Sequence, residues 1–221
     1  EAGMGKTRLV EEFAGRLRWQ GARVLWGRCY EFERLLPYQP VSEALRTLLP
    51  SLTPPELANL DPWVAAEVTR LVPEMSKQYT GPEVPAITDT AQEQARLFEG
   101  VAGLLNHSSA HQALLMVVED LHWASASTLQ MLHYLVRQLA DQKVLLVGTL
   151  RPEVLGRQHP LLALQRELSR EGLAQLLRLP RLSPEAVELM VVEMSGVGTT
   201  VIPLAERLYR ETEGNPFFLM E

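Results

Sequence analysis

The first seven residues of the chain carry the pattern with the most specific chemistry. Their end, Gly5-Lys6-Thr7, fits the phosphate-binding pattern G-x-x-x-x-G-K-[ST], whose first glycine would stand one position before Glu1. Glycines let backbone amides approach a triphosphate closely, and the N-terminus of a following helix adds further donors. The sequence therefore predicts an ATP-binding loop made of Gly3, Met4, Gly5, Lys6, Thr7 and Arg8.

Within this loop, two side chains have distinct predicted roles. Lys6 would reach the β- and γ-phosphates, and the hydroxyl of Thr7 would be a ligand of Mg²⁺. The alternative is a glycine turn that only begins a helix.

A second acidic element is needed to hold Mg²⁺ and to orient water. Glu119 and Asp120 follow directly on the apolar run 114–118, which is typical of a strand buried on both faces of a parallel sheet. We predict that Glu119 binds Mg²⁺ and that Asp120 polarises the attacking water, although the two roles could be exchanged. Acid pairs at strand ends are also found in ordinary solvated turns.

Two further residues are candidates for contact with the nucleotide. Arg151 follows another apolar run, 144–150, so it could project over the γ-phosphate. Pro216 follows Asn215 and could cover the base, but helix capping explains the same two residues without a ligand.

The elements that must position these residues follow from hydrophobic periodicity. Strands are predicted over residues 22–30, 114–118, 144–150 and 174–182. Helices are predicted over residues 7–20, 41–49, 63–71, 91–105, 129–139, 184–195 and 203–212.

This alternation of strands and helices predicts an α/β fold of the P-loop NTPase type, with a parallel sheet flanked by helices. We expect the strand that feeds the loop to be missing, because the loop pattern starts before Glu1, and we expect the chain to be a fragment. The predicted ATPase core is 1–182, with a helical insertion at 37–110, and 183–221 begins a helical subdomain.

Composition limits the other classes of function. The 221 residues suit one domain with a small appendage, and the net charge of −6 argues against direct nucleic-acid binding by this domain. A single cysteine and the lack of a long apolar stretch predict a soluble protein without disulfides or membrane spans, in the cytoplasm. No protease triad, zinc or guanine-binding pattern is present in the sequence.

With these motifs the chain resembles the bacterial STAND-type AAA ATPase domains of LuxR-like transcriptional regulators and multidomain signalling proteins. The resemblance rests on residues 1–10, 27–31, 37–40, 117–124, 148–152, 159–161, 182–185 and 213–217. It implies an ATP-dependent switch that regulates downstream domains, DNA-binding or repeat modules among them. It also implies that Arg151 is the sensor arginine and that Pro216 touches adenine. The family commonly has Asp where this chain has Glu119.

Three functions remain open from the sequence. The first is an ATP-binding, slowly hydrolysing regulatory module with ATP, ADP and Mg²⁺ as ligands, and nucleotide-dependent self-association is a further hypothesis. The second is a scaffold that binds nucleotide without hydrolysis and recruits a protein or inducer. The third is a kinase, which would use the same phosphate loop.

Overall fold

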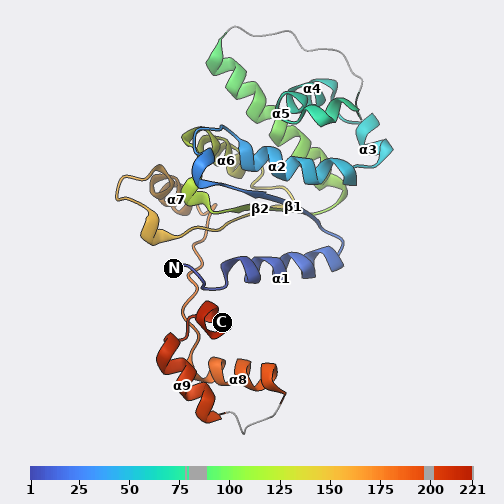
Figure 1. The fold of residues 1–221 in the computed structure, drawn as a ribbon. Helices are drawn as coiled ribbons and strands as arrows, with labels where there is room; N and C mark the ends of the chain where they lie inside the picture. Colours follow the sequence, from blue (N-terminus) through green and yellow to red (C-terminus); the bar gives the residue numbers. More distant parts are fainter. Residues whose placement is uncertain (78, 80–88, 197–201, 221) are drawn as a thin grey trace. The chain divides into compact units, whose positions relative to one another are not determined.

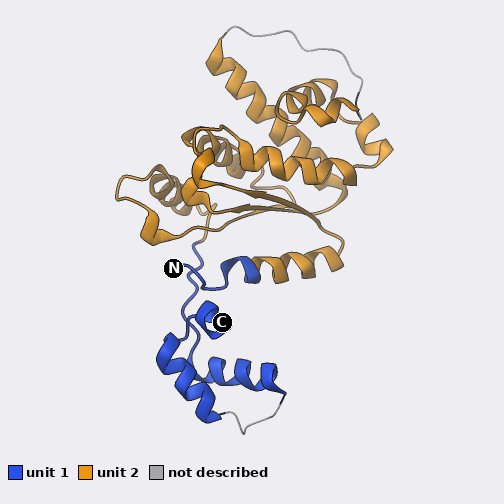
Figure 2. Cartoon of the chain, in the orientation of Figure 1, with its two compact units in different colours: residues 1–9, 176–221 blue, residues 10–175 orange. Residues whose placement is uncertain are grey.

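The computed structural model describes residues 1–77, 79, 89–196 and 202–220. It separates into two compact units, shown in Figure 2. The sheet unit comprises residues 10–175, and the smaller unit comprises residues 1–9 and 176–221. The predicted insertion 37–110 lies in the sheet unit, except that residues 78 and 80–88 are outside the described part of the chain.

The sheet unit is built on three parallel strands in the order β1-β2-β3. They are β1 (Arg23–Arg28), β2 (Leu114–Glu119) and β3 (Val144–Gly148). In the register of β1 and β2, Arg23 is opposite Leu114 and Arg28 is opposite Glu119. The chain therefore has the predicted α/β fold with a parallel sheet.

Side chains of the central strand β2 alternate between two apolar clusters because successive residues of a strand point to opposite faces. Leu115 and Val117 pack with Val10 and Ala14 of helix α1 (Lys6–Trp19). The other face is covered by helices of the same unit, as Figure 1 shows. All six residues of β2 are buried, which explains its uninterrupted apolar sequence.

Three helices contribute most to this second face. They are α2 (Gln39–Leu48), α5 (Thr90–His111) and α6 (Ala126–Gln138), and their buried side chains form one cluster with the strands. Helix α2 approaches β1 so closely that a Cβ on Gly27 would lie 1.9 Å from the carbonyl oxygen of Pro40. Only glycine fits at this point of β1.

The described residues between α2 and α5 include the helices α3 (Pro54–Ala58) and α4 (Pro62–Leu71). Short 3-10 helices occur at η1 (Glu31–Glu33), η2 (Leu49–Ser51), η3 (Pro73–Lys77), η4 (Leu121–Trp123) and η5 (Pro152–Val154). Pro54 and Pro62 are the first residues of α3 and α4, where a missing amide hydrogen costs nothing.

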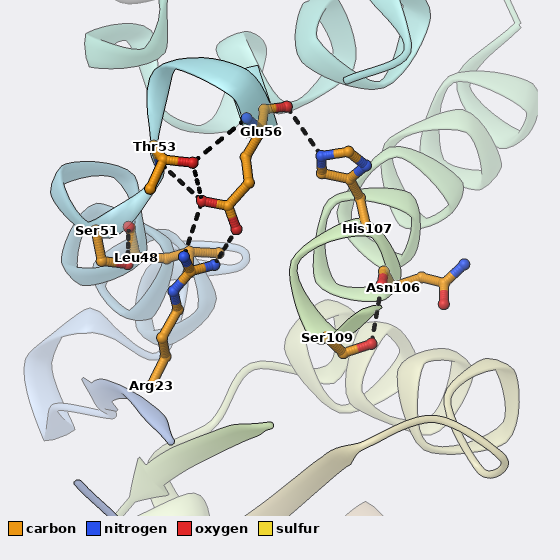
Figure 3. Close-up of polar contacts among 8 residues, drawn as sticks. All are labelled: Arg23, Leu48, Ser51, Thr53, Glu56, Asn106, His107 and Ser109. Atoms are coloured by element: carbon orange, nitrogen blue, oxygen red, sulfur yellow. Dashed lines mark hydrogen bonds and ion pairs between the residues drawn. The ribbon is translucent and has the colours of Figure 1, made fainter. Parts of the chain in front are cut away.

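A partly buried polar cluster attaches α3 to the sheet and to α5 (Figure 3). The carboxylate of Glu56 accepts hydrogen bonds from Arg23 and from the Thr53 backbone and hydroxyl, and the Glu56 carbonyl oxygen is 2.9 Å from His107 Nε2. The N-terminus of α3 is also capped by a reciprocal capping box between Thr53 and Glu56.

The last helix of the sheet unit is α7 (Pro160–Arg170), and the smaller unit contains α8 (Pro184–Ser195), α9 (Ile202–Thr212) and α10 (Pro216–Met220). Helix α8 begins as predicted, because the Ser183 side chain accepts a hydrogen bond from the amide of Ala186. It ends at Gly196, which has a left-handed conformation with φ 65°.

The prediction of a strand over 174–182 was wrong. The segment is neither strand nor helix, and Leu177 is 72% exposed. At its end, the Leu182 amide donates to the Gly214 carbonyl at 2.8 Å, a hydrogen bond between two distant segments of the smaller unit. A β-rich composition makes a strand only where a neighbouring strand is available to pair with it.

No helix in the described ranges of the chain is long and apolar enough to cross a membrane.

Candidate functional site

The phosphate loop is a glycine turn that leads directly into α1. Gly3 and Gly5 have φ values of 76° and 78°, and α1 begins at Lys6, with the Leu9 amide bonding the Gly5 carbonyl at 2.9 Å. Residues with side chains rarely adopt such positive φ values, so both positions favour glycine. The backbone thus has the form of a loop that can wrap around an anion at a helix N-terminus.

Within the smaller unit, the turn at Asn215 and Phe217 packs against this loop. A Cβ on Gly3 would lie 2.5 Å from Phe217 Cβ and 2.9 Å from Asn215 Oδ1. The Asn215 side chain donates to the Ala2 carbonyl at 3.5 Å and accepts from the Phe217 amide at 3.0 Å. Pro216, the predicted base contact, therefore belongs to a turn that caps α10 and also contacts the loop.

Lys6 and Glu1 contact each other inside the loop. The Lys6 ammonium donates to the Glu1 backbone carbonyl at 2.5 Å. The Glu1 carboxylate accepts two hydrogen bonds from Arg181, at 2.7 and 3.2 Å, and Arg181 also pairs with Glu213. Thr7 is half-buried and Arg8 is exposed on the first turn of α1.

In the sheet unit, Glu119 is the last residue of β2 and is only 2% exposed. Its Oε2 accepts a hydrogen bond from the Trp26 indole at 3.2 Å and another from the Arg28 guanidinium. Trp26 and Arg28 are two residues apart on β1, so their side chains leave the same face of the strand. Two donors of one strand therefore fix the carboxylate of its neighbour.

Asp120 has an unusual backbone conformation, with φ 55° in the left-handed region. Its amide donates to the Thr149 hydroxyl at 3.0 Å, and the next amide, of Leu121, donates to the Thr149 carbonyl at 2.8 Å. The Thr149 amide in turn donates to the Val118 carbonyl at 3.1 Å. Such a strained residue persists only when its surroundings determine its position, and Thr149 supplies that constraint.

The Asp120 carboxylate lies among three cationic or titratable groups. Its Oδ1 is 3.9 Å from both Arg151 Nε and His122 Nδ1, and its Oδ2 is 4.0 Å from Arg28 Nε. Partial burial opposes the charge of Arg28, but the charge and hydrogen bond of Glu119, with the charge of Asp120, raise the pKa of this guanidinium. Two acids and two arginines therefore gather at the carboxyl ends of the strands.

The structure brings together three of the residues predicted from the sequence, Glu119, Asp120 and Arg151, within the sheet unit. The others, Gly3 to Arg8 and Pro216, lie in the smaller unit.

Sequence reasoning missed Trp26, Arg28 and Thr149. The signal for Arg28 was its place at the end of a predicted strand, where it could meet acids that end a neighbouring strand. No local sequence pattern indicates that Trp26 or Thr149 would contact the acidic pair.

The donor set suits Mg²⁺, which prefers carboxylate oxygens and is usually held by one or two of them together with substrate phosphates. Glu119 and Asp120 provide such oxygens on adjacent residues. In the described residues there is no group of three or more His, Cys, Asp or Glu side chains that would make a complete protein cage for a metal.

Residues 1–147 match the sequence profile described as AAA ATPase domain, which covers the phosphate loop, β1 and the acidic pair. No curated protein matches the chain.

Proposed function

Because the chain belongs to the AAA ATPase domain family, we propose that it is an ATP-binding regulatory domain that hydrolyses ATP slowly with Mg²⁺. Family membership indicates nucleotide binding. The proposal adds slow turnover, coupled to a change between two conformations that controls other parts of a larger protein.

One observation carries this proposal, the glycine turn at the start of α1. Its two positive φ angles, at Gly3 and Gly5, shape a loop of backbone amides ahead of Lys6. Lys6 is the cation proposed to reach the β- and γ-phosphates, and Gly3, Met4, Thr7 and Arg8 complete the loop. In this proposal Thr7 also binds Mg²⁺ through its hydroxyl.

The acidic pair supplies the second part of the proposal. Glu119 would bind Mg²⁺ and Asp120 would accept a proton from the attacking water, while Arg151, near Asp120, would contact the γ-phosphate. When bound, the metal ion neutralises charge on the phosphates. The position of Glu119 at the end of the buried strand β2 and the constrained backbone of Asp120 support these roles because neither backbone must reorganise before reaction.

The setting of this activity is also proposed. We place the chain among STAND-type ATPase domains of signalling or transcription-regulating proteins, in the cytoplasm, with an ATPase core at 1–182 and a helical subdomain at 183–221. Partners would be ATP, ADP and downstream domains of the same protein, and Pro216 would contact adenine. Nucleotide-dependent self-association would accompany the switch.

A second function, a scaffold that binds nucleotide without hydrolysis, is favoured by one observation. The Glu119 carboxylate already pairs with Arg28, so its charge is balanced without a metal ion. Release of phosphate from ATP at steady state separates the two functions, since the scaffold would release none. Phosphate appearing on an acceptor would instead indicate a kinase.

Calorimetric titration of Mg-ATP into the chain tests nucleotide binding. We expect saturable binding that is lost in Lys6→Ala and kept in the matched control Lys77→Ala, which removes an exposed lysine from η3. Equal binding by the wild type and Lys6→Ala, or no binding by any of the three proteins, would overturn the proposal.

A further inference from the structure

Arg28 pairs with both acids of the candidate site. Its guanidinium donates to Glu119, and its Nε lies 4.0 Å from Asp120 Oδ2. The side chain starts at the carboxyl end of β1, opposite Glu119 in the strand register.

Burial makes this pairing necessary in the absence of a metal ion. The Glu119 side chain is 2% exposed, and an ionised carboxylate that is removed from water needs a compensating charge. The Trp26 indole gives a hydrogen bond to Glu119 but carries no charge. Arg28 therefore provides a positive charge in direct contact with the buried carboxylate.

The Arg28–Glu119 pair differs in exposure and in hydrogen bonding from the ion pair of Arg23 with Glu56. Those two side chains are only 10% and 5% exposed, and two hydrogen bonds join them. The Arg28 side chain is 42% exposed, and its hydrogen bond to Glu119 reaches the Oε2 atom. Arg28 can therefore leave for solvent at much lower cost than Arg23.

We propose that Arg28 is an internal counter-ion of Glu119 that a divalent cation replaces. This inference rests on the proposed function, because it requires Glu119 to be a metal ligand. A divalent cation at Glu119 and the guanidinium would repel each other within a few ångströms, so binding of one displaces the other. Arg28 then sets how much free Mg²⁺ the site needs, and it keeps the buried acid neutralised whenever the metal is absent.

Titration with Mn²⁺, followed by the electron paramagnetic resonance signal of the free ion, tests the competition. Wild type, Arg28→Gln, Arg28→Lys and Arg46→Gln are compared, each without nucleotide and with a saturating non-hydrolysable ATP analogue. Arg46 is the matched control because it is 40% exposed and pairs with a carboxylate, Glu74, outside the acidic pair.

We expect Arg28→Gln to bind Mn²⁺ about tenfold more tightly than the wild type, the size of change that one neighbouring charge commonly causes. Arg28→Lys keeps the charge and should match the wild type, as should Arg46→Gln. Equal or weaker Mn²⁺ binding by Arg28→Gln would overturn the inference.

A measurement on the wild type covers the case in which Arg28→Gln does not fold. The nitrogen-15 resonance of the Arg28 Nε–H group should shift when Mg²⁺ is added to the analogue-bound protein, and an unchanged resonance would contradict displacement. If no variant binds Mn²⁺, the inference fails. Titration of ATP in the presence of a metal chelator then shows separately whether the protein binds nucleotide as proposed.

Discussion

Arg23 and Glu56 join the first residue of β1 to helix α3 through two parallel hydrogen bonds of 2.7 and 2.9 Å. This geometry matches the planar guanidinium to both carboxylate oxygens. The hydrogen bonds of Arg23, opposed by burial and helped by those of Thr53, lower the pKa of Glu56 to about 2. The helical insertion is therefore attached to the sheet by a pair that stays ionised in mild acid.

Replacement of Glu56 by Gln should remove an acid-dependent part of the stability. The folded-state pKa lies below the ordinary value of 4.5, so the ionised carboxylate stabilises the fold above pH 4.5, and this stabilisation is lost as the pH falls toward 2. Between these pH values, the free energy of unfolding should fall by up to about 3 kcal/mol more in the wild type than in Glu56→Gln. Urea denaturation at several pH values measures this difference.

The matched control for this measurement is Glu74→Gln, which removes an exposed carboxylate paired with Arg46. A backbone hydrogen bond and Arg46 also lower the pKa of Glu74, but this pair is exposed, so Glu74→Gln should change the dependence on pH much less than Glu56→Gln. Parallel pH profiles of the wild type and Glu56→Gln would show that the Arg23 pair contributes nothing to acid sensitivity.

Thr149→Val should disturb Asp120 without touching its carboxylate. Valine fills the same space but cannot accept the hydrogen bond of the Asp120 amide, which costs about 1–3 kcal/mol when the group is buried. Thermal unfolding should show that loss, and ATP hydrolysis should slow while the ATP dissociation constant is kept. Thr149→Ser restores the hydroxyl and should recover both properties. If Thr149→Ser recovered neither stability nor hydrolysis, the effect of Thr149→Val would come from packing and not from the lost hydrogen bond.

Asp120→Asn should separate binding from turnover. The amide keeps the size of the side chain but is no longer a base, so we expect unchanged Mg-ATP binding and a fall in hydrolysis of about 100-fold or more. Phosphate release and calorimetry measure the two properties, with the exposed Asp141→Asn as control. Equal hydrolysis by the wild type and Asp120→Asn would exclude the role proposed for Asp120.

Because Arg181 contacts Glu1, we expect the effects of replacing these two residues on ATP affinity to be non-additive. Arg181→Gln removes the two hydrogen bonds that the Glu1 carboxylate accepts from Arg181 next to the phosphate loop, so ATP binding should weaken, within about fivefold because the pair is exposed to solvent. Glu1→Gln in the same protein should restore the affinity. The effect should vanish near 1 M salt, where the Debye length is about 3 Å.

The control for the Arg181 variants is Arg207→Gln, which breaks a pair with Glu211 on the surface of α9. Its affinity for ATP should equal that of the wild type. Additive effects of the Arg181 and Glu1 substitutions would mean that the two residues act independently.

Elements with a strong local pattern could be predicted from the sequence. The apolar run before Glu119 is strand β2, and the Ser183 and Asn215 starts of α8 and α10 are confirmed by their capping hydrogen bonds. These features depend on neighbouring residues, so a single stretch of sequence contains the information. Residues 174–182 had a similar local pattern but no adjacent strand, and that prediction was wrong.

The partners of the acidic pair depend on contacts between distant segments. Arg28 and Glu119 are 91 positions apart, and they meet only because β1 and β2 pair in one particular register. The glycine-lysine-threonine pattern identifies a phosphate loop, and the acids after β2 identify a candidate metal ligand. Neither pattern contains the cation that neutralises the acid, since that residue is chosen by the packing of the sheet.

The register of β1 against β2 also limits where the chain can change length. A single residue inserted between Trp26 and Arg28 would shift Arg28 to the opposite side of the sheet, because side chains alternate along a strand. Glu119 would then lose its cation although neither residue had been replaced. Insertions and deletions in related chains should therefore fall in the turns on either side of 23–28, while the strand itself keeps a constant length.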